Sequence, residues 1–316
     1  MPGIDEDIMR ELMHRCTDDL HASPHVAAAI VRRQRHRRLR NRALGVAVAG
    51  AAAGTAFAVV AASPGSTAGR GTGAATASGP TTIRLTAAQT ALYKLSKAAA
   101  KAAARPGGRY VIMTEKQDTY ARTSVLDSLT GDVWTYQQGA GVPSELPVAR
   151  HDSPTAAQFD AMPTDTATLR ARLLAQAKQE QAKAIAWQEK EMKAHGKKGT
   201  LASQPKLTDD DFVFEEATTM LWNPLVGSQL RSALYKVLAD TPGVRVDSHA
   251  RDDLGRPAVE ISRTATATGI EDQTFENPKT GAVLETAFIQ KDGTKGTDLY
   301  LSVTSRDTVP PNPYQS

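Results

Sequence analysis

Residues 257–305, PAVEISRTATATGIEDQTFENPKTGAVLETAFIQKDGTKGTDLYLSVTS, alternate short β-prone runs with turn residues. The runs are rich in valine, isoleucine, threonine and aromatic residues, and they predict strands at 257–264, 273–276, 282–290 and 299–305, after one at 244–249. Turn signals such as Asp253-Leu254-Gly255 and Asp292-Gly293 separate them. Because strands joined by short turns pair antiparallel, this part of the chain predicts a meander of five strands.

A second group of strands is predicted nearer the N-terminus, at 109–115, 119–129 and 133–138. The loops 127–131 (DSLTG) and 277–281 (NPKTG) share one pattern. Asp127 or Asn277 at the head can accept hydrogen bonds from the turn, and Gly131 or Gly281 at the end can adopt a positive φ. Both segments therefore predict hairpin loops.

Helices are predicted before and between the two strand groups. Thr86 and Gln89 have the spacing of a capping box, and further helices are predicted at 155–161, from residue 165, from residue 208 and at 229–239. Beyond Lys178, the long helix carries charges of alternating sign, including Glu180 and Lys183, which predict an exposed face. The separation of strands from helices predicts an α+β domain, with an antiparallel sheet and helices packed on one face.

An uncharged segment at 43–62 predicts a transmembrane helix. Its twenty residues include ten alanines and four valines, and as a helix they would extend about 30 Å, the thickness of a hydrocarbon core. Seven arginines and no acid lie at 32–42, whereas the next basic residue after the segment is Arg70. The positive-inside rule therefore predicts a cytoplasmic N-terminus. A cleaved signal peptide is the alternative, but its apolar stretch would begin well before residue 43.

Composition limits the classes of partner. The net charge is +4, of which nine arginines and six acids at 1–42 contribute +3, so no broad basic surface for nucleic acid is expected. Cys16 precedes the membrane segment, so the exported part can form no disulfide. The predicted organisation is a cytoplasmic tail at 1–42, a membrane helix at 43–62, a flexible linker at 63–84, an extracytoplasmic domain at 85–306 and a C-terminal tail at 307–316.

The cytoplasmic tail carries one apolar stripe. Ile4, Ile8, Leu12 and Leu20 recur at helical spacing, and Cys16 completes the series. A short helix without a domain to pack against is marginal in water, so the stripe is expected to contact either a partner's groove or the inner membrane surface. We propose the stripe as the partner-binding site.

No metal or cofactor is expected. His14, Cys16, His21 and His25 lack the paired cysteines of the zinc-containing anti-sigma proteins. The acids at 209–211 suit a helix N-terminus, with a calcium site as the weaker alternative. His151, His195 and His249 have no nucleophile signature nearby, so no catalytic residue is assigned and an enzyme is the least favoured class.

An ordered series of motifs resembles a known family. The series comprises Met162-Pro163-Thr164-Asp165, Leu169-Arg170, Leu230-Arg231-Ser232-Ala233-Leu234-Tyr235, Pro242-Gly243-Val244, Asp253, Gly255-Arg256, Asn277-Pro278-Lys279-Thr280-Gly281 and Leu284-Glu285. It resembles an uncharacterised family of single-pass membrane proteins of high-GC Gram-positive bacteria, commonly encoded beside extracytoplasmic-function sigma factors. This chain departs from the family pattern in the polar stretch 178–207 and in Asn277, where the family tends to have aspartate.

The resemblance implies a curved sheet similar to lipoprotein-carrier and sigma-regulator sensor domains. Two functions are expected from it. The first is a membrane-anchored sensor that binds a lipid or peptide ligand outside the membrane and regulates a sigma factor, or another cytoplasmic regulator, through its tail. The alternative is a membrane-tethered carrier of lipid or lipopeptide that uses the concave face of the sheet as an apolar cleft.

Overall fold

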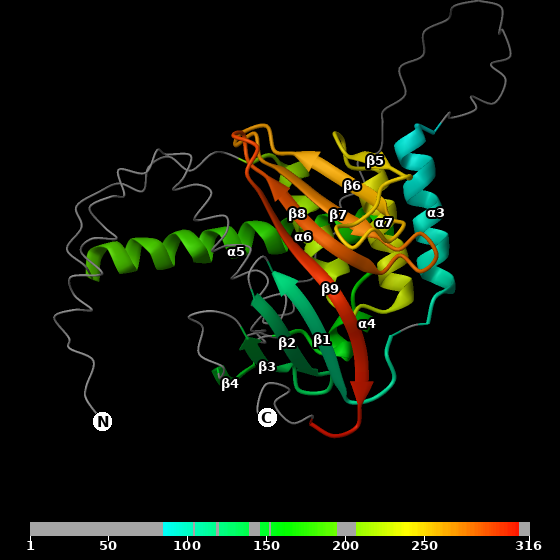
Figure 1. Cartoon of the computed structure of the whole chain (residues 1–316). Coiled ribbons are helices and arrows are strands. Elements are labelled where there is room, and N and C mark those ends of the chain that lie inside the picture. The colour runs from blue at the N-terminus through cyan, green and yellow to red at the C-terminus, as the bar shows by residue number, and fades with distance from the viewer. Residues whose placement is uncertain are drawn as a thin grey trace, which may run out of the picture.

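The computed structural model describes residues 85–103, 105–117, 120–138, 146–151, 153–194 and 207–309. These residues form an α+β fold in which a curved antiparallel sheet lies against helices (Figure 1). No helix among them is long and apolar enough to cross a membrane. The expected tail at 1–42, membrane helix at 43–62 and linker at 63–84 lie outside the described residues.

The first group of strands has one more member than predicted. It comprises β1 (Tyr110–Gln117), β2 (Tyr120–Asp127), β3 (Asp132–Gln138) and β4 (Leu146–His151). The sequence LPVARH of β4 was not predicted as a strand, because Pro147 interrupts it and β4 lies at the edge of the sheet, where a proline is tolerated. The hairpin loop between β2 and β3 is confirmed: Gly131 has φ 76°, and Asp127 Oδ1 accepts a 2.9 Å hydrogen bond from Leu129 N.

The second group contains the five predicted strands, namely β5 (Arg245–Asp247), β6 (Val259–Thr264), β7 (Glu271–Glu276), β8 (Val283–Ile289) and β9 (Lys295–Arg306). The predicted strands at 273–276 and 299–305 start too late, since β7 begins at Glu271 and β9 at Lys295. The β7–β8 loop has the expected geometry. Gly281 has φ 62°, and Asn277 Oδ1 accepts a 2.9 Å hydrogen bond from Lys279 N.

The last strand occupies the centre of the sheet. The order is β4-β3-β2-β1-β9-β8-β7-β6-β5, with antiparallel pairing throughout. β9 pairs with β1 along residues 298–306 and with β8 along residues 295–299. A single strand thus joins two meanders that lie far apart in the sequence.

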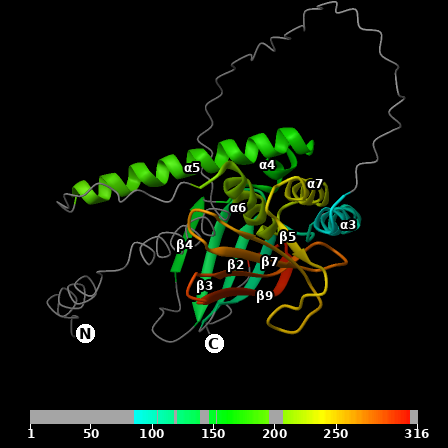
Figure 2. The ribbon, with the colours of Figure 1, turned by 90° about the horizontal axis from the view of Figure 1, so that it is seen from above.

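The helices lie on one side of the sheet, which we call its inner face (Figure 2). They are α3 (Ala87–Lys101), α4 (Ala156–Asp160), α5 (Thr166–Ala194), α6 (Asp209–Trp222) and α7 (Ser228–Ala239). The capping box of Thr86 and Gln89 is present at the start of α3, as predicted. The expectation of an exposed face beyond Lys178 is wrong at Glu180, which is 8% exposed and accepts a 3.0 Å hydrogen bond from Lys183 Nζ.

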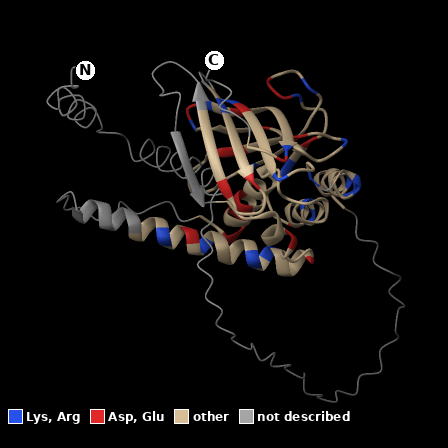
Figure 3. Cartoon of the chain, turned by 90° about the horizontal axis from the view of Figure 1, so that it is seen from below, with Lys and Arg blue, Asp and Glu red and all other residues tan. Residues whose placement is uncertain are grey.

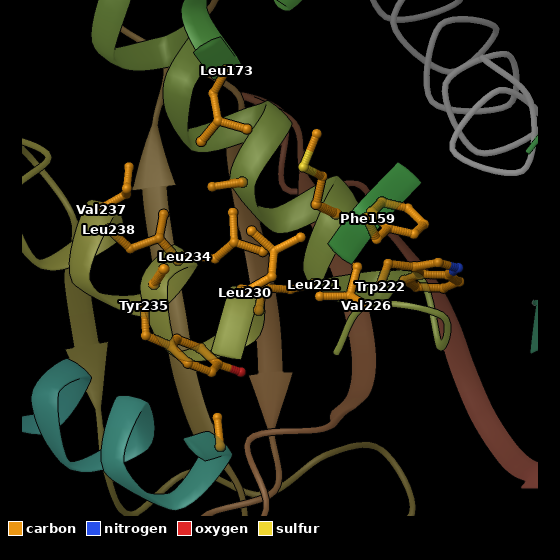
Figure 4. Close-up of a cluster of buried hydrophobic side chains, with 14 of the residues drawn as sticks. Phe159, Leu173, Leu221, Trp222, Val226, Leu230, Leu234, Tyr235, Val237 and Leu238 are labelled. Atoms are coloured by element: carbon orange, nitrogen blue, oxygen red, sulfur yellow. The ribbon is translucent and has the colours of Figure 1, made fainter. Parts of the chain in front are cut away.

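The core lies between the sheet and the helices (Figure 4). Leucine residues of α7, together with side chains of α6, fill its centre, and Tyr235 is fully buried among them. Leu230, Leu234, Val237 and Leu238 point inward, as the helical spacing at 229–239 predicts. Burying aliphatic and aromatic side chains stabilises the fold by about 1.5–3 kcal/mol each.

Candidate functional site

A row of polar side chains crosses the inner face of β2, β1 and β9. Arg122 lies opposite Glu115, and Glu115 lies opposite Tyr300, so the three side chains share one face. Arg122 Nη2 donates a 2.6 Å hydrogen bond to Glu115 Oε2. Arg122 is only 3% exposed and Glu115 is fully buried. Burying both charges of this ion pair carries a large desolvation cost in free energy, which their mutual attraction must offset.

The strand alternation places this pair inside. Val111 and Met113 of β1 belong to the core, so Glu115 continues the same face of the strand. Leu126 of β2 also belongs to the core. Arg122 and Ser124 precede it at steps of two and therefore lie on the same face. The β2–β3 hairpin turn ends β2 at Asp127 and thereby helps to fix which residues point inward.

Two aromatic residues join the row to the helix layer. The rings of Trp222 and Tyr300 have centroids 4.1 Å apart, and Tyr300 Oη donates a 2.9 Å hydrogen bond to the carbonyl oxygen of Trp222. This contact positions the C-terminal end of α6 against β9. We call the five residues Glu115, Arg122, Ser124, Trp222 and Tyr300 the Arg122 site.

The Arg122 site combines a cation, an anion, a hydroxyl and aromatic rings. Within the part of the chain that the structure describes, Arg122 Nε and Ser124 Oγ are buried without a hydrogen-bond partner. Unpaired buried donors are costly, and they are met in proteins by water, an ion or a ligand. The arrangement suits hydrogen bonding to a small polar group.

The three aspartates at the start of α6 pair with basic side chains. Lys178 Nζ lies 2.8 Å from Asp209 Oδ1. Arg170 pairs with Asp210, and Arg263 of β6 pairs with Asp211, whose carboxylate also accepts a 2.8 Å hydrogen bond from Thr208 N in a capping box. These acids link α5, α6 and β6. In the described ranges no group of three or more His, Cys, Asp or Glu could hold a metal ion.

Another buried acid lies where β7 meets α7. Glu276 is fully buried, and Thr274 Oγ1 donates a hydrogen bond to its Oε1. Burial raises the pKa of Glu276 to about 7, while Thr274, Tyr235 and the positive charge of Arg231 oppose the shift. Tyr235 Oη donates a 2.7 Å hydrogen bond to the carbonyl oxygen of Gly281, so Glu276 lies beside the contact that joins α7 to the β7–β8 loop.

The residues singled out from the sequence are not brought together. The stripe residues Ile4, Ile8, Leu12 and Leu20 lie outside the described residues, as do His14, Cys16, His21, His25 and His195. His151 is the last residue of β4. His249 is exposed in the β5–β6 connection, and its backbone N–H donates a 2.8 Å hydrogen bond to Asp247 Oδ1. Arg122, Glu115 and Glu276 were missed, because their burial depends on which face of each strand points inward, and the local sequence does not show that.

Comparison of the chain with protein-family models, curated proteins and solved structures finds no match.

Proposed function

We propose that the chain is a membrane-anchored binding protein with its folded domain outside the membrane. Residues 1–42 would then act on a sigma factor or another cytoplasmic regulator. The observation that carries the proposal is the layout: an acid-free arginine run, an uncharged segment at 43–62, a linker, and a described fold that begins at residue 85. The folded domain contains no cysteine, so its stability does not depend on disulfide bonds or on an oxidising compartment in which they could form.

The Arg122 site favours a ligand with hydrogen-bonding groups. Figure 3 shows charged residues on the strands that face the helix layer. Glu115 and Arg122 form their buried pair on the inner face of β1 and β2. An apolar lipid chain would leave Arg122 Nε and Ser124 Oγ unpaired, whereas a small polar group can pair with both. This chemistry supports a sensor or binder of a polar ligand over the lipid-carrier alternative.

Cysteine labelling in intact cells tests the topology. Cys16 is the single cysteine of the chain, and Leu129 is 68% exposed in the β2–β3 loop. In a Cys16→Ser background, Leu129→Cys should react with a membrane-impermeant maleimide added from outside. The unmodified chain should react at Cys16 only after lysis. Labelling of Cys16 in intact cells, or loss of residues 1–62 from the mature chain, would contradict the proposal.

A second experiment tests the effector end. Residues 1–42 on a solid support should retain a sigma factor from lysate of the native host, identified by mass spectrometry. A matched bait carrying Ile8→Asp and Leu12→Asp interrupts the apolar stripe and should retain none, because a charge on that face prevents its burial. Equal retention by both baits, or none by either, would count against regulation of a sigma factor through the tail.

A further inference from the structure

The central strand β9 has an open edge. β1 pairs with residues 298–306 of β9 on one side, whereas β8 pairs only with residues 295–299 on the other. Figure 1 shows β9 continuing past β8, and beyond Leu299 no described strand lies on that second side. Residues 300–306 therefore present unpaired backbone groups, as the outer strand of a sheet does.

Solvent reaches this part of β9 from both faces. Leu301 is 44% exposed and Val303 is 41% exposed, and Ser302 and Thr304 are exposed as well. Because neighbouring residues of a strand point to opposite faces, four consecutive exposed residues mean that neither face is covered there.

The edge lacks the usual protection against strand addition. Residues 300–305, YLSVTS, contain neither a charge nor a proline, and they have high β propensity. Exposed edges in stable proteins are ordinarily blocked by lysine, proline or a covering segment. An uncharged edge with two exposed apolar side chains is the kind of surface that peptide-binding domains use when they add a strand to their sheet.

The chemistry of the edge selects its occupant. Alternating N–H and C=O groups are matched by the backbone of an extended polypeptide. The chain's own end is a poor candidate, because prolines at 310, 311 and 313 remove the N–H groups that strand pairing needs. In a second copy, the same edge is part of a large sheet, so the two sheets would have to approach each other edge to edge. A free segment can pair without bringing a sheet with it.

We propose that residues 301–305 of β9 bind an extended peptide segment of another protein by adding it to the sheet as a strand. The segment is about six residues long, free of proline, and carries small or β-branched uncharged side chains beside Leu301 and Val303. This edge begins directly after Tyr300 and includes none of the five residues of the Arg122 site, so the inference does not require a ligand there.

Fluorescence anisotropy with the full-length chain in detergent tests the pairing. The probe is a labelled TVTVTVT peptide with two lysines at each end, and its partner probe is the same peptide N-methylated at every threonine and valine, so that neither edge of it can donate. The first should bind saturably below about 1 mM, and the second should bind at least about tenfold more weakly, since methylation removes backbone donors. Absence of binding below that concentration, or equal binding of both probes, overturns the proposal.

A pair of variants locates the binding. Leu301→Lys with Val303→Lys places charges on the edge and should weaken binding by about tenfold or more. Leu254→Lys is the matched control, because Leu254 is a 51% exposed leucine between β5 and β6 rather than on β9. This variant should bind the peptide as the unmodified chain does. Equal weakening in both variants overturns the proposal. Concentration-dependent dimers that the first variant abolishes would assign the edge to a second copy instead.

Amide hydrogen exchange gives an independent measure. Without the peptide, alternate amides between residues 301 and 305 should exchange quickly, because only half of them face β1. Saturating peptide should slow the fast set and leave the rest of the sheet unchanged. Slow exchange throughout the free strand would show that the edge is already paired, and it would refute the inference.

Discussion

Buried charge is handled in two different ways in this domain. Glu115 forms a direct ion pair with Arg122 at 2.6 Å. Glu276, in contrast, is fully buried, accepts a hydrogen bond from Thr274, and interacts with Tyr235 and with the charge of Arg231. The first arrangement offsets the desolvation of a carboxylate by direct pairing, and the second shifts the equilibrium toward the protonated acid. Each arrangement predicts a distinct response to substitution.

Glu276 should make the domain less stable as the pH rises. Its pKa is about 7 in the folded state against 4.5 ordinarily, so its stabilising effect is complete below pH 4.5 and is lost as the pH rises through 7. The difference corresponds to roughly 3 kcal/mol. Glu276→Gln should remove this dependence and raise the free energy of unfolding at pH 8 by about 1–3 kcal/mol, measured by urea denaturation at pH 5 and pH 8.

Glu271→Gln is the control for that experiment. Glu271 lies on the same strand, but hydrogen bonds from Arg245 and Gln273 outweigh partial burial and lower its pKa. Its removal should change the pH profile slightly and in the opposite sense. If Glu276→Gln leaves the pH dependence of unfolding unchanged, the account of the buried acid is wrong.

Removing one member of the Arg122–Glu115 pair should be costly. Arg122→Met leaves Glu115 buried without its partner and should lower the free energy of unfolding by about 3–5 kcal/mol. The double variant Arg122→Met with Glu115→Leu should recover most of this loss. Arg245→Met breaks a more exposed pair with Glu271 and should cost at most about 1 kcal/mol. Similar losses for Arg122→Met and Arg245→Met would contradict the burial argument.

Individual site residues were only partly predictable from the sequence. The capping role of Thr86 follows from spacing alone, because its partner Gln89 is three residues away. The pairing of Arg122 with Glu115 also lies within one hairpin, but the inner face of that hairpin had to be known first. Glu276 depends on Tyr235 and Arg231 from a distant helix, and no local pattern carries that information.

At the scale of secondary-structure elements, two turn glycines that look alike in sequence should differ in importance. Gly281 and Gly293 both have positive φ, of 62° and 83°. A Cβ at Gly281 would lie 2.9 Å from Tyr235 Cε2, whereas a Cβ at Gly293 would meet nothing within 4 Å. Gly281→Ala should therefore cost about 2–4 kcal/mol and Gly293→Ala only about 1, both measured by chemical denaturation. Equal costs would mean that the positive φ alone, and not the contact with Tyr235, determines the loss of stability.

The cap of α6 can be tested in the same way. Thr208 Oγ1 accepts a 3.2 Å hydrogen bond from Asp211 N, so Thr208→Ala should lower the free energy of unfolding by about 1 kcal/mol. Thr218 is on the same helix, but its hydroxyl donates to the carbonyl of Phe214 within the helix. Thr218→Ala should therefore be close to neutral. A larger effect at Thr218 than at Thr208 would refute the capping account.

Elements with strong local signals were predicted well. The helix at 229–239 and the hairpin loops at 127–131 and 277–281 depend on apolar spacing and turn chemistry, which are properties of short segments. β4 was missed because edge pairing tolerates a proline that local propensity rejects. The buried position of Glu180 was missed because its charge pattern indicates an exposed face, whereas tertiary packing decides its exposure.

At the scale of the whole molecule, the two meanders depend on β9. The sequence predicted the α+β class and the antiparallel pairing, but not that the last strand lies between β1 and β8. Strand order across a long separation is set by tertiary packing rather than by turns. β1 and β9 carry Tyr110 and Arg306 as direct partners, although nearly two hundred residues separate them in the sequence.

Deletion of β9 should therefore abolish the fold. A chain that ends at residue 290 lacks the strand that joins β1 to β8, and we expect it to be degraded by trypsin far faster than the full chain. A chain that ends at residue 309 keeps β9 and should resist trypsin as the full chain does. Comparable resistance of the shorter chain would show that the two meanders fold independently.

The central position of β9 also bears on export. If the domain crosses the membrane as an unfolded thread, it must not fold while its earlier segments are still in the cytoplasm. β1 cannot complete its pairing until residues 298–306 have been synthesised, so the native sheet cannot form before the other described strands have left the ribosome. On the proposed topology, this strand order would delay folding and so keep the nascent domain competent for translocation.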